Sequence, residues 1–468
     1  MKITKLIVTL GVAVVLSMAF ASCQPAPVAP AEEKPVAVAE TKPAESEAAG
    51  ATQPAAEEKQ EVGTVTLWTQ YNTDTPASAR DKMFSEMLPK ISEGVGGKIV
   101  NVNQPYDQLF AKANLAVQSG GEVPDVLEVH MISFPFLVSN GVLEDITEYV
   151  ESSPAYADLS KDAIDSCRGS DGRIYCVPMS LATTTMYYYP ELWPNGFPTS
   201  TEEMLKEAPR LKELGYFAMA GKVSEIFGGE YGLFPFVKSF GGSLAVDGKI
   251  AWASPETVKV VEFFREMYKN GYIPESMMSP GFDSQSIFQN GKAASFMAGT
   301  WSYAFLYPVV TPGGEKYDLG GESIIKAVAD GKVAIAPMLT APGGKSYSPY
   351  EGRGWGIMKG AKNVYGAKAF MEYIVQPEQN AEFCYAVGHI PIAQGAKEDP
   401  RYADTLYWQE IFAKIEPNTV KLDPIPNNVN QIMQKFADTV STLILDQNLD
   451  IMTELEKAQN EANVLLEE

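Results

Sequence analysis

The sequence predicts an α/β protein with at least two lobes, from its length and from the alternation of strand and helix patterns. The chain has 468 residues, more than one hydrophobic core usually supports, so two or more lobes are expected. Patterns typical of strands and helices alternate in the order strand 64–70, helix 77–92, strand 98–102, helix 107–119 and strand 125–129. This β-α-β-α-β order predicts a largely parallel sheet with helices on both faces.

Two further helical segments are expected in the second half of the chain. Ser254-Pro255-Glu256 combines an N-cap with a proline in the first turn and predicts a helix that ends at Gly271. Residues beyond 428 carry an apolar stripe at helical spacing and are expected to be wholly helical. The apolar side chains of these helices are expected to lie in the hydrophobic core.

A secretory signal at the N-terminus is the most specific motif of the sequence. Two lysines precede an apolar run from Leu6 to Phe20, which is too short for a transmembrane helix. The run leads into Ala21-Ser22-Cys23, which resembles a bacterial lipobox, a signal in which the cysteine is acylated and becomes the mature N-terminus. We therefore expect residues 1–23 to be a lipoprotein signal peptide with the lipid on Cys23; the alternative is an ordinary signal peptide with an incidental cysteine. No other run is apolar enough to span a bilayer, so membrane contact is expected only through this lipid anchor.

Residues 24–62 have the composition of a disordered tether. They are mostly Ala, Pro, Glu, Lys, Val and Gln, and they contain no aromatic residue. A segment this polar and proline-rich cannot bury enough apolar surface to order itself. As a flexible coil of roughly 40 residues it would span on the order of 35 Å, which would hold a folded body above a membrane surface.

Charge and composition exclude several classes of function. The net charge of −22 argues against nucleic acid as a partner, because phosphates require clustered Lys and Arg. The chain has four cysteines without a CxxC pair and two histidines, so no metal site is expected. Since no GxSxG, HExxH or Walker-type GxxxxGKS/T motif is present, we expect no catalytic residue and no cofactor. Paired carboxylates among the 59 acidic residues leave a secreted glycoside hydrolase as the enzymatic alternative.

Three tryptophans stand at a predicted strand or beside glycines. Trp68 lies in the first predicted strand, Trp301 follows Ala298-Gly299-Thr300, and Trp355 lies within the segment 352–356, which contains three glycines. An aromatic ring held where glycines allow close approach of the backbone is suited to a flat apolar ligand face, such as that of a pyranose. Stacking contributes about 0.5–1.5 kcal/mol per ring beyond area burial. The alternative is that each tryptophan packs in the core.

Several segments together resemble the family 1 extracellular solute-binding proteins, the maltose-binding-like class. They are Phe110-Ala-Lys-Ala with Ser119-Gly-Gly-Glu-Val-Pro-Asp125-Val and Val138-Ser-Asn-Gly-Val-Leu143; Gly172-Arg-Ile-Tyr-Cys-Val-Pro178 with Met186-Tyr-Tyr-Tyr-Pro-Glu-Leu192; Gly291-Lys-Ala-Ala-Ser-Phe-Met-Ala-Gly-Thr-Trp301; and Gly354-Trp-Gly-Ile-Met-Lys-Gly with Gly388-His-Ile-Pro391. Each segment is weak alone, and their order and spacing along the chain carry the resemblance.

The resemblance implies a type II periplasmic-binding-protein fold, in which two α/β lobes are joined by a hinge and enclose the ligand in an interlobe cleft. The lobes would comprise 64–177 plus about 336–385, and 178–335 plus about 386–468, with crossovers near 177–180 and 334–339. Ligand would favour the closed form by touching both lobes. The implied function is capture of a small solute by a monomer on the extracytoplasmic side of a bacterial membrane, in the periplasm or at the cell surface. The implied partner is the permease of an ABC importer.

By the family pattern, the ligand-binding residues lie at strand ends and in the loops that follow. The matching positions are Trp68, Gln70, Tyr71, Glu128, His130, Tyr187, Tyr188, Asp283, Trp301, Arg353 and Trp355. The charges on Glu128, Asp283 and Arg353 suit sugar hydroxyls but also a charged solute. The expected ligand is therefore a mono- or oligosaccharide, with a peptide, a polyamine or a polyol phosphate as alternatives.

A disulfide is expected between Cys167 and Cys176. The intervening Ser170-Asp171-Gly172 is a turn signal, and a hairpin folded on it would bring the two cysteines opposite each other. Secretion supplies the oxidising environment that a disulfide needs. Cys384 is then expected as a buried free thiol in a helix over 377–386; the alternative is that Cys167 and Cys176 are unpaired core residues.

Overall fold

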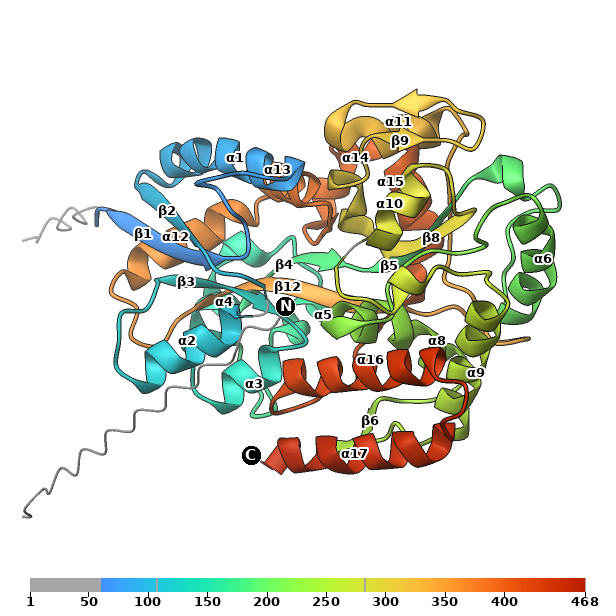
Figure 1. Cartoon of the computed structure of the whole chain (residues 1–468). Coiled ribbons are helices and arrows are strands. Elements are labelled where there is room, and N and C mark those ends of the chain that lie inside the picture. Colours follow the sequence, from blue (N-terminus) through green and yellow to red (C-terminus); the bar gives the residue numbers. More distant parts are fainter. Residues whose placement is uncertain (1–59, 107, 282, 468) are drawn as a thin grey trace, which may run out of the picture. The chain divides into compact units, whose positions relative to one another are not determined.

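The computed structural model describes residues 60–106, 108–281 and 283–467 (Figure 1). The expected signal peptide, the lipid site at Cys23 and the tether up to residue 59 lie outside the described residues. Val62 was expected at the end of the tether, but its side chain is buried, and its carbonyl accepts a hydrogen bond of 2.7 Å from Asn363 Nδ2. Ordered packing therefore begins at least as early as Val62.

The larger of two main sheets has seven strands in the order β13-β4-β12-β3-β1-β2, with β14 paired to β12. The bounds of its strands are β1 Thr64–Thr69, β2 Lys98–Asn103, β3 Val126–His130, β4 Val177–Ala182, β12 Ser348–Ile357, β13 Ile390–Pro391 and β14 Thr419–Lys421. β1 pairs in parallel with both β2 and β3, which confirms the parallel arrangement predicted for the first three strands. β12 runs antiparallel between β3 and β4.

Helices cover both faces of this sheet, and Figure 1 shows α1 and α13 on one side and α2 and α3 on the other. Their bounds are α1 Ala79–Val95, α2 Leu109–Gln118, α3 Phe134–Ser139, α12 Val364–Ile374 and α13 Pro377–Val387. α1 begins with a capping box, in which Ser78 Oγ accepts the Asp81 N–H at 3.1 Å and the Asp81 carboxylate accepts the Ser78 N–H at 3.2 Å. This reciprocal pairing satisfies backbone donors that no helical carbonyl can reach.

The smaller main sheet has three antiparallel strands in the order β11-β5-β8, with bounds β5 Thr184–Tyr188, β8 Ser295–Gly299 and β11 Ala334–Ala336. The chain crosses from the large sheet to the small one between β4 and β5, and it returns between β11 and β12. The first crossover was expected at 177–180, but β4 stays hydrogen-bonded to β12 through Ala182, so the crossover falls at Thr183. The segment after 385 was also assigned to the second lobe, yet β13 pairs with β4 in the large sheet.

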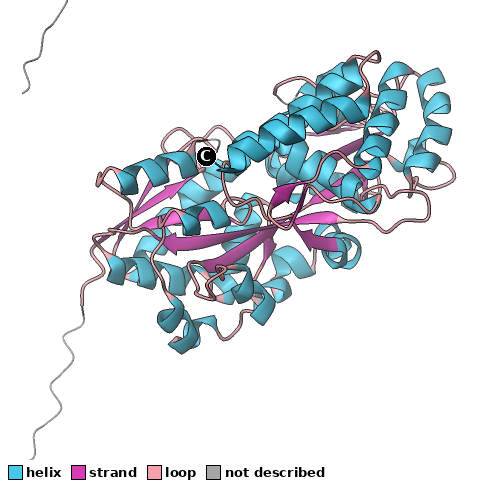
Figure 2. Cartoon of the chain, turned by 90° about the horizontal axis from the view of Figure 1, so that it is seen from below, coloured by secondary structure: helices cyan, strands magenta, loops and turns pink. Residues whose placement is uncertain are grey.

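Helices also flank the small sheet, as the view in Figure 2 shows. The larger ones are α6 Thr201–Glu213, α9 Pro255–Lys269, α10 Asp283–Gln289, α11 Ser323–Ala329, α16 Val429–Leu445 and α17 Ile451–Glu467. Shorter elements are α4 Thr147–Ser152, α5 Lys161–Ser166, α7 Glu225–Phe227, a π-helical turn Gly228–Leu233, α8 Phe234–Ser239, α14 Pro400–Ala403 and α15 Leu406–Glu410. The helix predicted from Ser254 is confirmed as α9. The segment after residue 428, which was expected to be wholly helical, forms α16 and α17 with the non-helical residues 446–450 between them. Among residues 60–467 that the structure describes, no helix is both long and apolar enough to cross a membrane.

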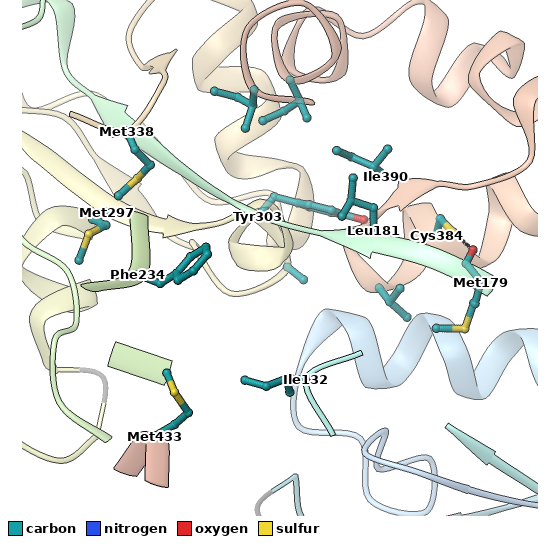
Figure 3. Packing of buried hydrophobic residues seen from close by; sticks show 14 of the residues in the cluster. Ile132, Met179, Leu181, Phe234, Met297, Tyr303, Met338, Cys384, Ile390 and Met433 are labelled. Carbon is teal, nitrogen blue, oxygen red and sulfur yellow. Dashed lines mark hydrogen bonds between the residues drawn. The ribbon is translucent and has the colours of Figure 1, made fainter. Parts of the chain in front are cut away.

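The apolar core packs against the large sheet and continues to the segments where the chain passes between the two sheets. Leu181 of β4 and Ile390 of β13 are register partners, and Figure 3 shows both close to Tyr303. Cys384 is buried and free, with its thiol 3.5 Å from the carbonyl oxygen of Met179 (Figure 3), as predicted for this cysteine. Cys167 and Cys176 form the predicted disulfide, with their Cα atoms 5.1 Å apart.

Candidate functional site

A cavity of about 400 Å³ lies where residues of the large sheet and its helices meet residues of the small sheet. The large-sheet side contributes polar and aromatic side chains, which are Gln70, Arg80 and Tyr106. The other side contributes Thr184, Gly221, Lys222, Tyr231, Gly232, Ser284, Gln285, Phe296, Met297, Ala298, Gly299, Trp301, Ser302 and Phe305. Its size and its mixture of aromatic and polar side chains are typical of a small-molecule site.

Strand ends position the central side chains of the cavity. Gln70 directly follows β1, and Trp301 lies in the 3₁₀ turn that directly follows β8. The indole of Trp301 lies directly over the end of β8. A Cβ on Gly299 would lie only 2.1 Å from atoms of the indole ring. The ring of Tyr231 meets the indole edge to face, with centroids 4.6 Å apart. Glycine at position 299 is therefore required for this aromatic wall.

A buried hydrogen-bonded cluster lies beside the cavity and begins at Gln70. The backbone N–H and the Nε2 of Gln70 each donate to the Glu128 carboxylate at 2.9 Å. His130 Nε2 lies 3.2 Å from Glu128 Oε1 and is also contacted by Arg353 Nη1. On its other side, Arg353 Nε lies 2.7 Å from Glu351 Oε2. This cluster orients Gln70 toward the cavity from a rigid base.

The cluster continues across the cavity through Tyr106, Tyr231 and Glu230. The hydroxyl of Tyr106 donates to Glu230 Oε2 at 3.3 Å, and the Arg353 guanidinium lies 5.9 Å from the Tyr106 ring centroid. Tyr106 precedes α2 at the large sheet, whereas Glu230 belongs to the π-helical turn beside the small sheet. The contact therefore joins the two sides of the cavity.

Burial and neighbouring charges shift the protonation of this cluster. Burial alone would raise the pKa of Glu128, but its interactions with His130 and Arg353 and the Gln70 N–H lower it well below the usual range. Burial, reinforced by Arg353, lowers the pKa of His130 to about 4, so the imidazole is neutral at pH 7. Burial also raises the pKa of Glu351 to about 7, despite the nearby Arg353. The pKa of Glu230 is raised well above its ordinary value, first by burial and then by the proximity of Glu351.

The structure brings five of the predicted site residues to the cavity or to the buried cluster beside it. Gln70 and Trp301 line the cavity itself. Glu128, His130 and Arg353 lie in the cluster, where the β12–β3 register places Arg353 opposite His130. They support the cavity wall and are not among the residues that line it.

Three other predicted site residues are core residues, and the structure corrects their assignment. Tyr71 is fully buried against Phe84, with ring centroids 4.9 Å apart. Tyr187 is fully buried, and its hydroxyl lies 2.6 Å from that of Tyr407. Trp355 is fully buried, and it packs edge to face on Phe370 of α12 and Phe383 of α13.

The remaining predicted residues also lie outside the cavity lining. Trp68 is partly buried on β1, with its backbone paired to β2 and β3, and packs against the core. Tyr188 stacks on Phe197 with ring centroids 4.5 Å apart. Asp283 is exposed at the start of α10, although the next two residues, Ser284 and Gln285, line the cavity.

Several residues that line the cavity were not predicted from the sequence, although the sequence around Tyr231 contains a pattern that could have indicated it. Tyr231 lies within Gly228-Gly-Glu-Tyr-Gly232, so it has the same aromatic-beside-glycine pattern that singled out Trp301. A Cβ on Gly232 would lie 2.1 Å from the carbonyl oxygen of Lys222, so glycine is required there. Arg80 and Tyr106 carry no comparable local pattern, because their place at the cavity depends on packing between distant segments.

Known proteins with similar sequences are solute-binding proteins. Residues 79–407 match the model of the bacterial extracellular solute-binding protein family, and the chain belongs to this family. It is 22% identical over 455 residues to the maltooligosaccharide ABC transporter solute-binding lipoprotein of Streptococcus pneumoniae R6, covering 87% of this chain and 96% of that protein. It is also 24% identical over 309 residues to the sn-glycerol-3-phosphate-binding periplasmic protein UgpB of Shigella dysenteriae, covering 62% and 66%.

Solved structures show the same fold. The GacH receptor of Streptomyces glaucescens, solved unliganded and with acarbose, superposes with a TM-score of 0.71 at 18% identity, covering 87% of this chain and 99% of that one. Maltose-bound MalE3 of T. maritima gives a TM-score of 0.71 at 17% identity, covering 86% and 100%. The expected type II periplasmic-binding-protein fold is confirmed.

Proposed function

We propose that this solute-binding protein captures a mono- or oligosaccharide in the cavity and delivers it to the permease of an ABC importer. The observation that carries the proposal is the cavity of about 400 Å³ whose wall is formed by the Trp301 and Tyr231 rings and by polar groups such as Gln70 and Ser302. Aromatic faces suit the apolar face of a pyranose, and the polar groups suit its hydroxyls. The relatives named for maltooligosaccharide and maltose support the same ligand class.

The solute is held by closure of two lobes about a hinge. The lobes follow those expected from the sequence, 64–177 plus about 336–385 and 178–335 plus about 386–468, except that β4 and β13 belong with the first lobe, because both pair in the large sheet. Thr183 and the segment after Ala336 then form the hinge, since the chain passes there between the two sheets. The 3.3 Å contact between Tyr106 and Glu230 is one that opening would break. Ligand contacts on both sides would favour the closed form.

The protein works on the extracytoplasmic side of a bacterial membrane as a monomer held by a lipid on Cys23. The polar, proline-rich segment between Cys23 and the packed Val62 would provide reach between the lipid and the folded body. This arrangement leaves the cavity free to sample solute while keeping the body close to its permease.

A ligand screen with the purified protein tests the proposal. The panel contains mono- and oligosaccharides, sn-glycerol 3-phosphate, a short peptide and a polyamine, and the measurement is the melting temperature followed by calorimetry. A saccharide at 100-fold excess over its dissociation constant should raise apparent stability by about 2.7 kcal/mol. The saccharide should be recovered unchanged. Binding of only the non-sugar compounds, or hydrolysis of an oligosaccharide at an enzyme-like rate, would contradict the proposal.

A further inference from the structure

Arg80 lines the cavity, and none of the described residues supplies a counter-charge within ion-pair distance of its guanidinium. It is the second residue of α1, and its guanidinium lies 5.2 Å from the ring centroid of Tyr71 and 5.2 Å from that of Phe305. Tyr71 belongs to the core of the large-sheet body, whereas Phe305 follows the turn after β8. The guanidinium is therefore held between rings from the two sides of the cavity, and Arg80 is one of the residues that line it.

Arg80 differs from every other arginine of the chain in its lack of an acceptor. Within the described residues, no carboxylate lies within ion-pair distance of Arg80, and its Nε is buried without a hydrogen-bond partner. The other arginines have carboxylate or backbone carbonyl partners, and they are Arg168, Arg173, Arg210, Arg265, Arg353 and Arg401. A partly desolvated guanidinium without an acceptor is costly, so an acceptor from a ligand would be strongly favoured.

The charge on the cavity wall is positive, although the whole chain carries a net charge of −22. Arg80 and Lys222 line the cavity, and none of the described lining residues is an Asp or a Glu. Lys222 pairs with Glu225, so Arg80 is the cation of the described wall that has no carboxylate within ion-pair distance. The buried carboxylates of the neighbouring cluster do not lie within ion-pair distance of Arg80.

We propose that the solute carries an anionic group, a carboxylate or a phosphate, which Arg80 binds while Trp301 contacts the sugar ring. The planar guanidinium fork matches both anions bidentately, and such charged hydrogen bonds are stronger than those to neutral hydroxyls. The inference rests on the proposed function, because it specifies the class of sugar that the cavity accepts. The acceptable ligands are then acidic saccharides, either uronic acids or sugar phosphates.

Affinities for matched neutral and acidic sugars test the inference. Calorimetry with glucose, glucuronate and glucose 6-phosphate, and with maltose and its uronic-acid counterpart, separates the carboxylate from the phosphate. At least one acidic member should bind about 10- to 100-fold more tightly than its neutral counterpart, with a preference that falls as ionic strength rises. Arg80→Gln should abolish this preference, and Arg80→Lys should retain only part of it, because Lys keeps the charge but lacks the fork. Arg173→Gln, at an exposed ion pair, is the matched control and should keep the preference.

Three outcomes would overturn the inference in distinguishable ways. Equal or tighter binding of the neutral sugars would refute the anionic class while leaving the proposed function intact. An acidic preference that survives in Arg80→Gln, with an unchanged melting temperature for that variant, would exclude Arg80 as its source. Absence of binding by every saccharide, neutral or acidic, would refute the proposed function together with the inference.

Discussion

Trp301 and Trp355 show how the surroundings of a residue decide its role. Both stand beside glycines in the sequence, but Trp301 follows the end of β8 and lines the cavity, whereas Trp355 lies inside β12. β12 is flanked by β3 and β4, and the Trp355 indole points into the layer of α12 and α13. A side chain in the middle of a covered strand has no access to a ligand.

Replacing the two tryptophans should therefore separate binding from folding. Trp301→Ala should weaken ligand binding by about 1–3 kcal/mol, because stacking and apolar burial are both lost. Trp355→Ala should instead lower the free energy of unfolding by about 3–5 kcal/mol, because it leaves a cavity in the core. Calorimetry gives the first quantity and urea unfolding the second. A Trp301→Ala variant with wild-type affinity would remove the indole from the binding site.

Glu351 should make the stability of the folded protein depend on pH. Its pKa rises from the ordinary value of 4.5 to about 7 on folding, because burial, reinforced by the nearby Glu128, outweighs the lowering effect of Arg353 and Tyr231. The folded state then binds more protons than the unfolded state between these values, so this contribution to stability is present below pH 4.5 and is lost as the pH rises to about 7. His130 acts in the opposite direction, since burial lowers its pKa.

Comparison with Glu351→Gln isolates the effect from those of the other groups. The stability of the variant relative to the wild type should rise across the same pH window, by at most about 1.4 kcal/mol per pH unit. Urea unfolding at a series of pH values from 4 upward measures this difference, and a difference independent of pH would show that Glu351 does not titrate there.

The hairpin closed by the Cys167–Cys176 disulfide is held by backbone hydrogen bonds and packs against β12. Gly169 N donates to the carbonyl oxygen of Arg173 at 2.8 Å across the turn, and Tyr175 N donates to that of Cys167 at 3.0 Å. The two sulfur atoms pack against β12, because a Cβ on Gly354 would lie 3.0 Å from Cys176 Sγ. The disulfide therefore links the hairpin to the centre of the large sheet.

Removing this disulfide should lower stability modestly. Its cysteines are nine positions apart, so the double variant Cys167→Ala/Cys176→Ala should lose about 2–3 kcal/mol in the chain-entropy description. The melting temperature of the variant measures the loss, and mass spectrometry of an unreduced tryptic digest identifies the bridge. Ready alkylation of both cysteines in the native secreted protein would contradict it.

The lipid anchor proposed on Cys23 would place the binding site at the extracytoplasmic face of a membrane. Cys23→Ser should release the protein from membranes or block its processing, because the residue proposed to carry the lipid is lost. Fractionation and the mass of the mature N-terminus measure the two effects. Cys384→Ala, which removes a buried thiol, should leave partitioning unchanged. Membrane-bound, normally processed Cys23→Ser protein would exclude the lipoprotein assignment.

The α/β class, the first three strands and the disulfide could all be predicted from the sequence. These features depend on local signals, such as the alternation of strand and helix periods or an Asp-Gly turn between two cysteines, and such signals act over a few residues. The sequence also indicated Trp301, an aromatic residue beside a glycine, and the family resemblance indicated Gln70. Family resemblance supplied the two-lobe arrangement.

The aromatic residues that line the cavity, and the charges that lack partners among the described residues, could be identified only from the packing of distant segments. Tyr71, Tyr187 and Trp355 have site-like sequence positions, yet helices and strands far along the chain cover them completely. Arg80 has no acceptor among the described residues, and its guanidinium lies over the ring of Phe305, which is 225 residues later in the chain. The burial of a side chain and the partners of a charged group depend on residues that are distant in the sequence, so a short segment of sequence does not determine them.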